Sequence, residues 1–334
     1  MILPPKLKTG DEVRVIAPSC TLPSLKWLTE EFLDEAKKFF TDLGMTVSEG
    51  KHLREIDEFD STKLENRLED LHDAFRDPKV KMVITIRGGW NCNQLLPYLD
   101  YDLIKKNPKI LCGFSDITAL SNAIYAKTGL VGYSGQNFYS FCIGDQLNYT
   151  FDYFKKCVME EGEFEVLPSK QWSNDRFTAD HRVMAFEENK GWWNLNPGKA
   201  EGTLVGGNLC TLQLLQGTEY MPSLKDSVVF AEDDYECTPQ GFDRDLESLT
   251  QQPDFDSVRG LVIGRFEKAV ANKNMSPMSK NLLTQIVKSK KKLSKIPVIA
   301  NVDFGHTNPI FTFPVGGTVK VSAKEKPRIT IMEH

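Results

Sequence analysis

The sequence lacks the long hydrophobic segment that would place a protein in a membrane. No stretch of it approaches the roughly 20 apolar residues that span a bilayer. The N-terminal Met-Ile-Leu-Pro-Pro also lacks the charged segment and following apolar run that are typical of a secretion signal. We therefore expect a cytoplasmic protein with no membrane partner.

Cysteine is present, but not in a pattern that binds metal or builds a disulfide framework. The seven cysteines are odd in number and include no C-x-x-C pair. Cys112 lies inside an apolar strand pattern and is expected to be a small core residue. No other set of metal ligands is visible, so we expect no metal.

The sequence also has no glycine-rich turn after its first strand pattern and no excess of positive charge. Residues 17–20 are Ala-Pro-Ser-Cys, whereas a dinucleotide oxidoreductase needs glycines there. The net charge of -5 is not the footprint of a nucleic-acid binder. The basic run at 288–295 is interpreted as the polar end of a helix. We expect neither a cofactor nor a nucleic-acid partner.

The 334 residues, of which 40% are hydrophobic, are enough for one or two sizeable cores. Up to about residue 160, strand-like segments alternate with amphipathic helical ones. This alternation predicts an α/β fold with a doubly wound parallel sheet of the flavodoxin-like type, whose ligands bind at the strand C-termini. The predicted strands are 12–19, 46–48, 81–87, 110–114 and 130–133, and the predicted helices include 25–43, 61–76 and 119–127.

The second half of the sequence predicts a smaller, mixed α/β and β-rich domain. Its expected strands are 202–205, 227–231, 261–266, 298–302 and 317–322, with helices near 209–216, 243–250 and 280–290. Residues 168–199 show no sustained period and are interpreted as an interdomain crossing with a long functional loop. The predicted division is therefore an N-terminal α/β domain at 1–167, the crossing at 168–199, and a C-terminal domain at 200–334.

The most informative segment is Gly-Phe-Ser-Asp at 113–116, because a strand pattern runs into it and a helix pattern follows at once. Ser115 would stand on a sharp turn beside the unpaired N–H groups of the helix, which favour negative charge. Serine hydrolases use such a turn in the motif G-x-S-x-G, but Ile117 replaces its second glycine here. A helix N-cap without chemistry explains the same residues.

Two other strand ends carry side chains that could assist a serine. Of the five histidines, His306 alone ends a buried strand pattern, where the backbone is fixed and the ring stays accessible. The strand at 227–231 ends in Glu232, Asp233 and Asp234, and one of these carboxylates could orient an imidazole. A loop histidine bonded to backbone and a solvated acidic loop are the alternatives. The other histidines lie in polar, loop or terminal segments and are His52, His72, His181 and His334.

Six motifs in order resemble the LD-carboxypeptidase family of serine peptidases, which includes the muramoyltetrapeptide carboxypeptidases and the microcin C self-immunity peptidases. They are GDEVRVIAPS at 10–19, TIRGG at 85–89, GFSD at 113–116, GTLVGGN at 202–208, FAED at 230–233 and FGH at 304–306. The resemblance covers nearly the whole chain. It implies Ser115 as the nucleophile, His306 as the general base and Glu232 as the acid that orients it. The triad would then assemble at the domain boundary.

The resemblance also implies an oxyanion hole and part of a substrate site. The backbone N–H of Gly89, or of Gly88 as the alternative, would form the oxyanion hole with the backbone N–H of Asp116. Glycines at the end of a strand let backbone N–H groups approach a ligand closely. Arg87, Gly88 and Asn208 are expected to contact the substrate. Family members are commonly dimers, so we expect a homodimer.

The segment 190–198, Lys-Gly-Trp-Trp-Asn-Leu-Asn-Pro-Gly, bears on the choice of substrate. A flat face on Trp192 or Trp193 could stack on a purine, which favours a peptide- or aminoacyl-nucleotide substrate and a role in microcin immunity and antibiotic resistance. The alternative is a muramoyltetrapeptide LD-carboxypeptidase that releases terminal D-alanine in murein recycling, with both tryptophans structural. A non-enzymatic small-molecule binding protein is a remote third class.

Overall fold

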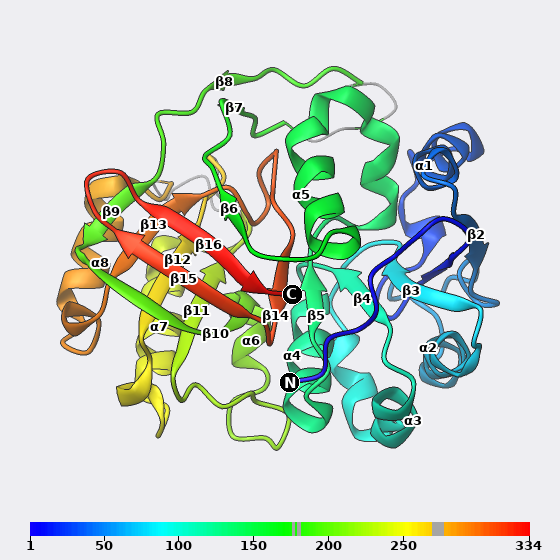
Figure 1. Cartoon of the computed structure of the whole chain (residues 1–334), viewed down its shortest axis with the longest axis horizontal. Helices are drawn as coiled ribbons and strands as arrows, with labels where there is room; N and C mark the ends of the chain where they lie inside the picture. Colours follow the sequence, from blue (N-terminus) through cyan, green and yellow to red (C-terminus); the bar gives the residue numbers. More distant parts are fainter. Residues whose placement is uncertain (176–177, 179–181, 269–276) are drawn as a thin grey trace.

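Two β-sheets organise the chain, and each is built mainly from one half of the sequence (Figure 1). The computed structural model describes residues 1–175, 178, 182–268 and 277–334. The first sheet has the strand order β14-β5-β4-β3-β1-β2. Its strands are β1 (Glu12–Ile16), β2 (Thr46–Glu49), β3 (Val80–Thr85), β4 (Ile110–Gly113), β5 (Gly132–Ser134) and β14 (Phe313–Val315).

Strands β1 to β5 are all parallel, which confirms the doubly wound, flavodoxin-like prediction. Strand β14 alone runs antiparallel, at the edge beside β5. Strands β3 and β4 are apolar on both faces because helices cover both sides of a parallel sheet. The carboxyl ends of β1, β3 and β4 therefore meet along one edge.

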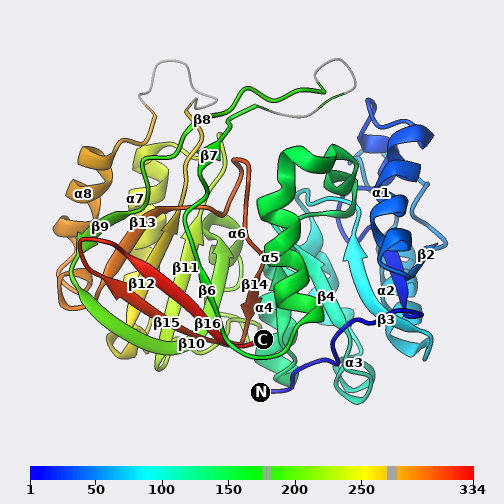
Figure 2. The same cartoon turned by 45° about the horizontal axis from the view of Figure 1, so that its top comes forward.

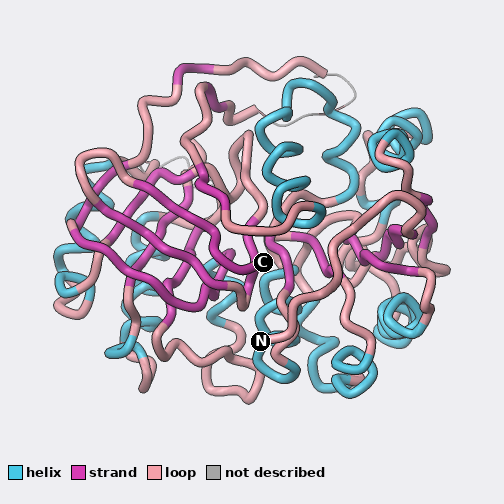
Figure 3. Tube along the Cα trace, viewed as in Figure 1, coloured by secondary structure: helices cyan, strands magenta, loops and turns pink. Residues whose placement is uncertain are grey.

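Helices cover the two faces of the first sheet separately (Figures 1 and 3). Phe40 and Phe154 pack with Val15 on one face, whereas Phe75 and Leu120 pack on the other. The first face is covered by α1 (Glu30–Asp42) and α5 (Asn148–Met159), and the second by α2 (Leu64–Arg76), α3 (Tyr101–Lys106) and α4 (Ile117–Thr128).

The second sheet has eight strands in the order β6-β16-β15-β10-β11-β12-β13-β9. Its parallel centre is β10 (Gly198–Asn208), β11 (Ser227–Glu232), β12 (Gly260–Gly264) and β13 (Val298–Val302). Antiparallel strands flank it: β6 (Phe164–Val166), β15 (Thr318–Ala323), β16 (Arg328–Glu333) and β9 (Trp193–Asn196). Helices α6 (Leu209–Gln213), α7 (Pro239–Thr250) and α8 (Lys280–Ser289) pack on one face. A separate pair is β7 (Gln171–Trp172) with β8 (Glu187–Glu188).

The two sheets are joined through α4 and β10, which lie in the middle of the molecule (Figure 2). Asn122 exchanges two hydrogen bonds with the backbone of Gly206, and Thr118 Oγ1 accepts one from the N–H of Asn208. A Cβ at Gly207 would lie 2.6 Å from Thr118 Oγ1, so this contact needs a glycine. The helix that follows Ser115 is thus bonded directly to the second sheet.

Several sequence expectations need correction. The helix expected from residue 25 begins only at Glu30, because residues 22–24 form a short 3-10 turn instead. Helix α5 and strand β16 were not predicted. Residue His52 is buried, with 7% of its surface exposed, although its segment is polar. His181 lies outside the described residues. Within the described part of the chain, no helix is long and apolar enough to cross a membrane.

Candidate active site

Ser115 stands on a strained turn between β4 and α4. Its φ of 64° is in the left-handed region, which is unfavourable for a residue with a side chain. Strain of this kind is typical of a serine held out on a strand-to-helix turn. The turn is fixed from both sides, since Gly113 closes β4 and Ile117 opens α4.

A chain of hydrogen bonds connects Ser115 with the second sheet. Ser115 Oγ lies 3.1 Å from His306 Nε2, and His306 Nδ1 lies 2.8 Å from Glu232 Oε2. Glu232 is the last residue of β11, and His306 follows β13. Residues at or just after the ends of three strands, distant in sequence, therefore bring a hydroxyl, an imidazole and a carboxylate into one hydrogen-bonded relay.

Two glycines leave room for the Glu232 side chain. A Cβ at Gly305 would lie 2.8 Å from Glu232 Oε2, and Gly305 has a φ of +111°. A Cβ at Gly264 would lie 2.7 Å from Glu232 Cβ. Since Glu232 is only 3% exposed, its carboxylate is held by close packing as well as by His306.

The charge of Glu232 changes the acidity of His306. Burial would lower the pKa of the imidazole, but the charge and hydrogen bond of Glu232, together with the charges of Asp234 and Glu267, outweigh it and raise the pKa to about 9. The neighbouring Asp233 is buried, and its desolvation together with the Glu232 charge raises its pKa to about 7. Asp233 Oδ1 accepts from the N–H of Asp234 and from Asn208 Nδ2, whereas the hydrogen bond to the imidazole comes from Glu232.

The loop after β3 passes directly over the serine. A Cβ at Gly88 would lie 3.0 Å from Ser115 Cβ, and one at Gly89 would lie 2.3 Å from Ser19 Oγ. Gly89 has a φ of +157°. Among the described residues, neither the N–H of Gly89 nor that of Asp116 donates to a protein acceptor.

A pocket with a volume of about 480 Å³ opens over Ser115 and His306. Its aromatic lining is Trp27, Trp90, Phe114, Tyr139 and Tyr235, and its charged lining is Arg87, Asp175, Asp234 and Glu236. Trp90, directly after Gly89, is 67% exposed. A larger hollow of about 1140 Å³ lies over β10, β15 and β16 and contains none of these residues.

Of the five residues expected to contact the substrate, Arg87 lines this pocket, whereas Gly88, Trp192, Trp193 and Asn208 do not. Trp192 is buried, and its Nε1 donates to Asp303 Oδ2 at 2.8 Å. Trp193 pairs with β13 through strand β9. Asn208 caps α6 by accepting from the N–H of Thr211. The sequence showed an aromatic pair in a loop but not the buried carboxylate that holds one of its rings.

Two residues near the site were missed by the sequence interpretation. Trp90 lines the pocket, and Ser19 bonds to the side chain of Asp116 beneath the loop. Both lie within or beside the motifs at 10–19 and 85–89. Their place in those motifs is the signal that could have found them.

Residues 13–135 match the family described as the LD-carboxypeptidase N-terminal domain, and residues 201–321 match the LD-carboxypeptidase C-terminal domain. The chain belongs to the LD-carboxypeptidase family. Several of its relatives carry carboxypeptidase names, and the chain is a serine-type carboxypeptidase.

Two curated relatives extend over nearly the whole chain. A Bacillus subtilis (strain 168) protein named "Putative carboxypeptidase YocD" is 48% identical over 330 residues, 98% of this chain and 99% of the relative. A second protein of that organism, named "Probable murein peptide carboxypeptidase", is 31% identical over 326 residues, 98% of this chain and 93% of the relative.

Solved structures share the same fold. An MccF-like protein from Bacillus anthracis str. Ames superimposes with a TM-score of 0.94 at 48% identity, and the match covers 100% of both chains. MccF in complex with glutamyl sulfamoyl guanosine has a TM-score of 0.88 at 28% identity, covering 100% of this chain and 99% of that one. MccF is the microcin C7 self-immunity protein of Escherichia coli.

Proposed function

We propose that this carboxypeptidase uses Ser115, His306 and Glu232 as a catalytic triad to cleave the amide between a peptide or aminoacyl group and a nucleotide. The proposal is supported by the continuous hydrogen-bonded line from Ser115 Oγ through both ring nitrogens of His306 to Glu232, at the floor of an aromatic pocket.

In the proposed reaction, Ser115 Oγ attacks the carbonyl carbon of the amide while His306 Nε2 takes the hydroxyl proton. His306 then gives that proton to the leaving nitrogen, and the acyl group stays on Ser115. Water, deprotonated by His306, attacks the acyl carbon and frees the serine. Glu232 holds the ring and stabilises its positive charge.

The backbone N–H groups of Gly89 and Asp116 are the proposed oxyanion hole. Donors that are already fixed in place stabilise the negative oxygen of the tetrahedral intermediate without reorganisation. Asp116 follows Ser115 directly and Gly89 lines the same pocket, and neither N–H donates to a protein acceptor among the described residues. The position of Asp116 before α4 adds the favourable field of a helix N-terminus.

Aromatic side chains in the pocket favour the nucleotide substrate. Trp90 offers its exposed ring to a base, in place of the tryptophans at 192 and 193. Arg87 matches an anionic linkage, and Asp234 and Glu236 match an ammonium group. An aminoacyl-nucleotide carries a base, an anionic linkage and an ammonium together.

The second candidate is cleavage of a murein tetrapeptide with release of D-alanine. It is favoured by the murein peptide carboxypeptidase that is 31% identical to this chain. Such a peptide carries both kinds of charge but no base that would stack on Trp90.

Mass spectrometry of the products distinguishes the two candidates. The protein is incubated with an aminoacyl-sulfamoyl adenosine and, separately, with an L,D-tetrapeptide, with Ser115→Ala as the control. We expect release of the amino acid from the first substrate by the wild type, and a loss of about 10³- to 10⁶-fold in Ser115→Ala. Cleavage of the tetrapeptide alone would select the second candidate, and near-normal turnover by Ser115→Ala would contradict the triad.

A homodimer, a cytoplasmic location and a role in antibiotic resistance are further parts of this proposal. Light scattering of the purified protein tests the first of them, and a mass equal to one chain would contradict it.

A further inference from the structure

Three separate segments meet at the side chain of Asp116, the residue after the serine. Asp116 Oδ2 accepts from Ser19 Oγ at 2.5 Å and from the N–H of Cys92 at 2.9 Å. The N–H of Asn91 also donates to this carboxylate. One carboxylate thus connects the serine turn with the loop after β1 and the loop after β3.

Burial of this carboxylate costs free energy, and no direct ion pair offsets that cost among the described residues. Asp116 is 2% exposed, and among the described residues no lysine, arginine or histidine forms an ion pair with it. Arg67 lies nearby, but its guanidinium donates to Pro18, Asn91 and Gln94 instead. Desolvation outweighs the hydrogen bonds and the Arg67 charge and raises the pKa of Asp116, so burying this carboxylate costs stability that an uncharged group in a purely structural role would not cost.

We propose that the Asp116 carboxylate is the positioning group of the oxyanion hole. This role presupposes the function proposed above. The backbone N–H of Asp116 is one donor of that hole, and the loop that its side chain holds at Asn91 and Cys92 carries the other donor, Gly89. A single residue therefore fixes the spacing between both donors and the serine.

The contacts around Gly89 explain why such an anchor matters. Ser19, which donates to Asp116, lies where a Cβ of Gly89 would be, and the N–H of Cys20 donates to Gly88 O at 3.2 Å. The glycine loop is therefore packed against a segment that Asp116 itself holds. A shift of about 1 Å in such a donor costs as much as 100-fold in rate, because the oxyanion then lies out of reach.

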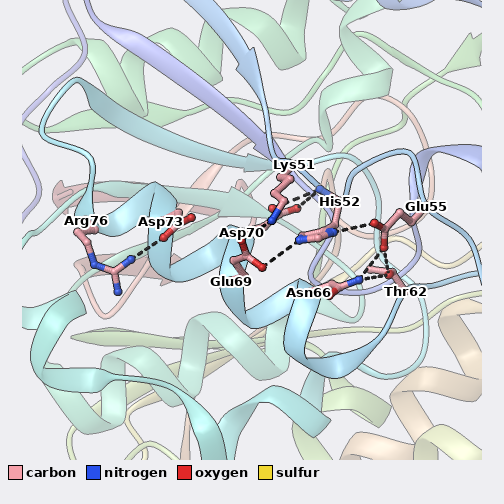
Figure 4. Close-up of polar contacts among 9 residues, drawn as sticks. All are labelled: Lys51, His52, Glu55, Thr62, Asn66, Glu69, Asp70, Asp73 and Arg76. Atoms are coloured by element: carbon pink, nitrogen blue, oxygen red, sulfur yellow. Dashed lines mark hydrogen bonds and ion pairs between the residues drawn. The ribbon is translucent and has the colours of Figure 1, made fainter.

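Asp116→Asn tests the inference, with Asp70→Asn as the matched control. Asp70 is also a buried carboxylate, 5% exposed, that accepts from a backbone N–H, that of His52, and burial raises the pKa of both carboxyls. Figure 4 shows Asp70 in a network with His52 and Lys51, and it does not line the catalytic pocket. The control therefore reports what the loss of a buried carboxylate does to folding alone.

The readouts are kcat and KM for the aminoacyl-sulfamoyl adenosine, the rate of labelling by a fluorophosphonate, and Tm. For Asp116→Asn we expect kcat and the labelling rate to fall about 10- to 100-fold, with KM changed less than about threefold. Asp70→Asn should lower Tm and leave kcat at the wild-type value. If Asp116→Asn does not fold, Ser19→Ala carries the test, with an expected fall of about 3- to 10-fold in kcat because only one donor is lost.

Wild-type kcat in Asp116→Asn, or an equal fall in Asp70→Asn, would overturn the inference. So would a rise in KM at constant kcat, since it would place Asp116 in substrate binding. Near-normal labelling and turnover by Ser115→Ala would instead refute the proposed function, so the two failures are distinguishable.

Discussion

The two sheets hold their parts of the site by different physical means. On the first sheet the backbone conformation is decisive: Ser115 and Gly89 both have positive φ, and the groups that we propose act on the substrate are a hydroxyl and two N–H groups. On the second sheet, charge dominates, because Glu232 is buried beside His306 and raises the pKa of the imidazole. Substitutions on the first sheet should therefore change the rate at every pH, whereas those on the second should also change its pH dependence.

Removal of the Glu232 charge should distinguish the contribution of the second sheet from that of the first most clearly. Since the His306 pKa is raised to about 9, kcat/KM of the wild type should rise with pH up to that value, because only the neutral ring can take the Ser115 proton. Glu232→Gln should lower the pKa of His306 and shift the rise to lower pH. Its maximum should fall about 10²- to 10⁴-fold, because the ring loses its orienting carboxylate. An unshifted pH profile of kcat/KM would show that Glu232 does not set the acidity of His306.

The same pair makes stability depend on pH. A pKa raised from 6.5 to about 9 means that the folded state binds the proton more tightly than the unfolded state. This stabilisation is complete below about 6.5 and is lost as the pH rises through about 9. Thermal unfolding of Glu232→Gln and of the wild type at pH 6 and pH 10 measures this stabilisation, which should separate the two Tm values more at pH 6 than at pH 10.

Alanine at one glycine of each sheet makes the comparison sharper. At Gly89 the new Cβ would meet Cys20 N at 2.9 Å, and at Gly305 it would meet Glu232 Oε2 at 2.8 Å. Both substitutions should lower kcat/KM by about 10- to 1000-fold, because a donor or the carboxylate must move. Only Gly305→Ala should shift the pH profile of kcat/KM. A shifted pH profile of kcat/KM in Gly89→Ala would mean that the first sheet also affects the acidity of His306.

Two tryptophans give a smaller contrast between pocket and core. With aminoacyl-nucleotides, Trp90→Ala should lower kcat/KM about 5- to 150-fold, which corresponds to about 1–3 kcal/mol of lost transition-state stabilisation. The Tm of this variant should stay nearly unchanged. Trp192→Ala should instead lower stability by about 3–5 kcal/mol, because its ring is buried and its Nε1 bonds to Asp303. Chemical denaturation and steady-state kinetics of both variants measure the contrast. Equal kinetic losses with the L,D-tetrapeptide would contradict base stacking by Trp90.

Chelation gives the smallest expected effect, which is none. Neither side of the site contains, among the described residues, a group of histidine, cysteine or acidic side chains suited to a metal ion. Activity should therefore be the same before and after dialysis against EDTA. A loss that zinc restores would contradict a triad working without metal.

The sequence by itself determined the features that depend on neighbours in the chain. The alternation of strand and helix patterns predicted the parallel order of β1 to β5, and the turn at Ser115 followed from a strand pattern meeting a helix pattern. The six ordered motifs indicated the family. Each of these signals is local, because periodicity and turn chemistry act over a few residues.

Only the tertiary structure decided which distant groups meet. The family resemblance named Glu232, but only the tertiary structure shows that its carboxylate, and not that of Asp233, forms the hydrogen bond with His306. The tertiary structure also buried Trp192 against Asp303 and added β14 to the first sheet from the far end of the chain. These outcomes depend on packing between segments more than 70 residues apart, for example the 74 between Glu232 and His306, and no local pattern encodes such contacts.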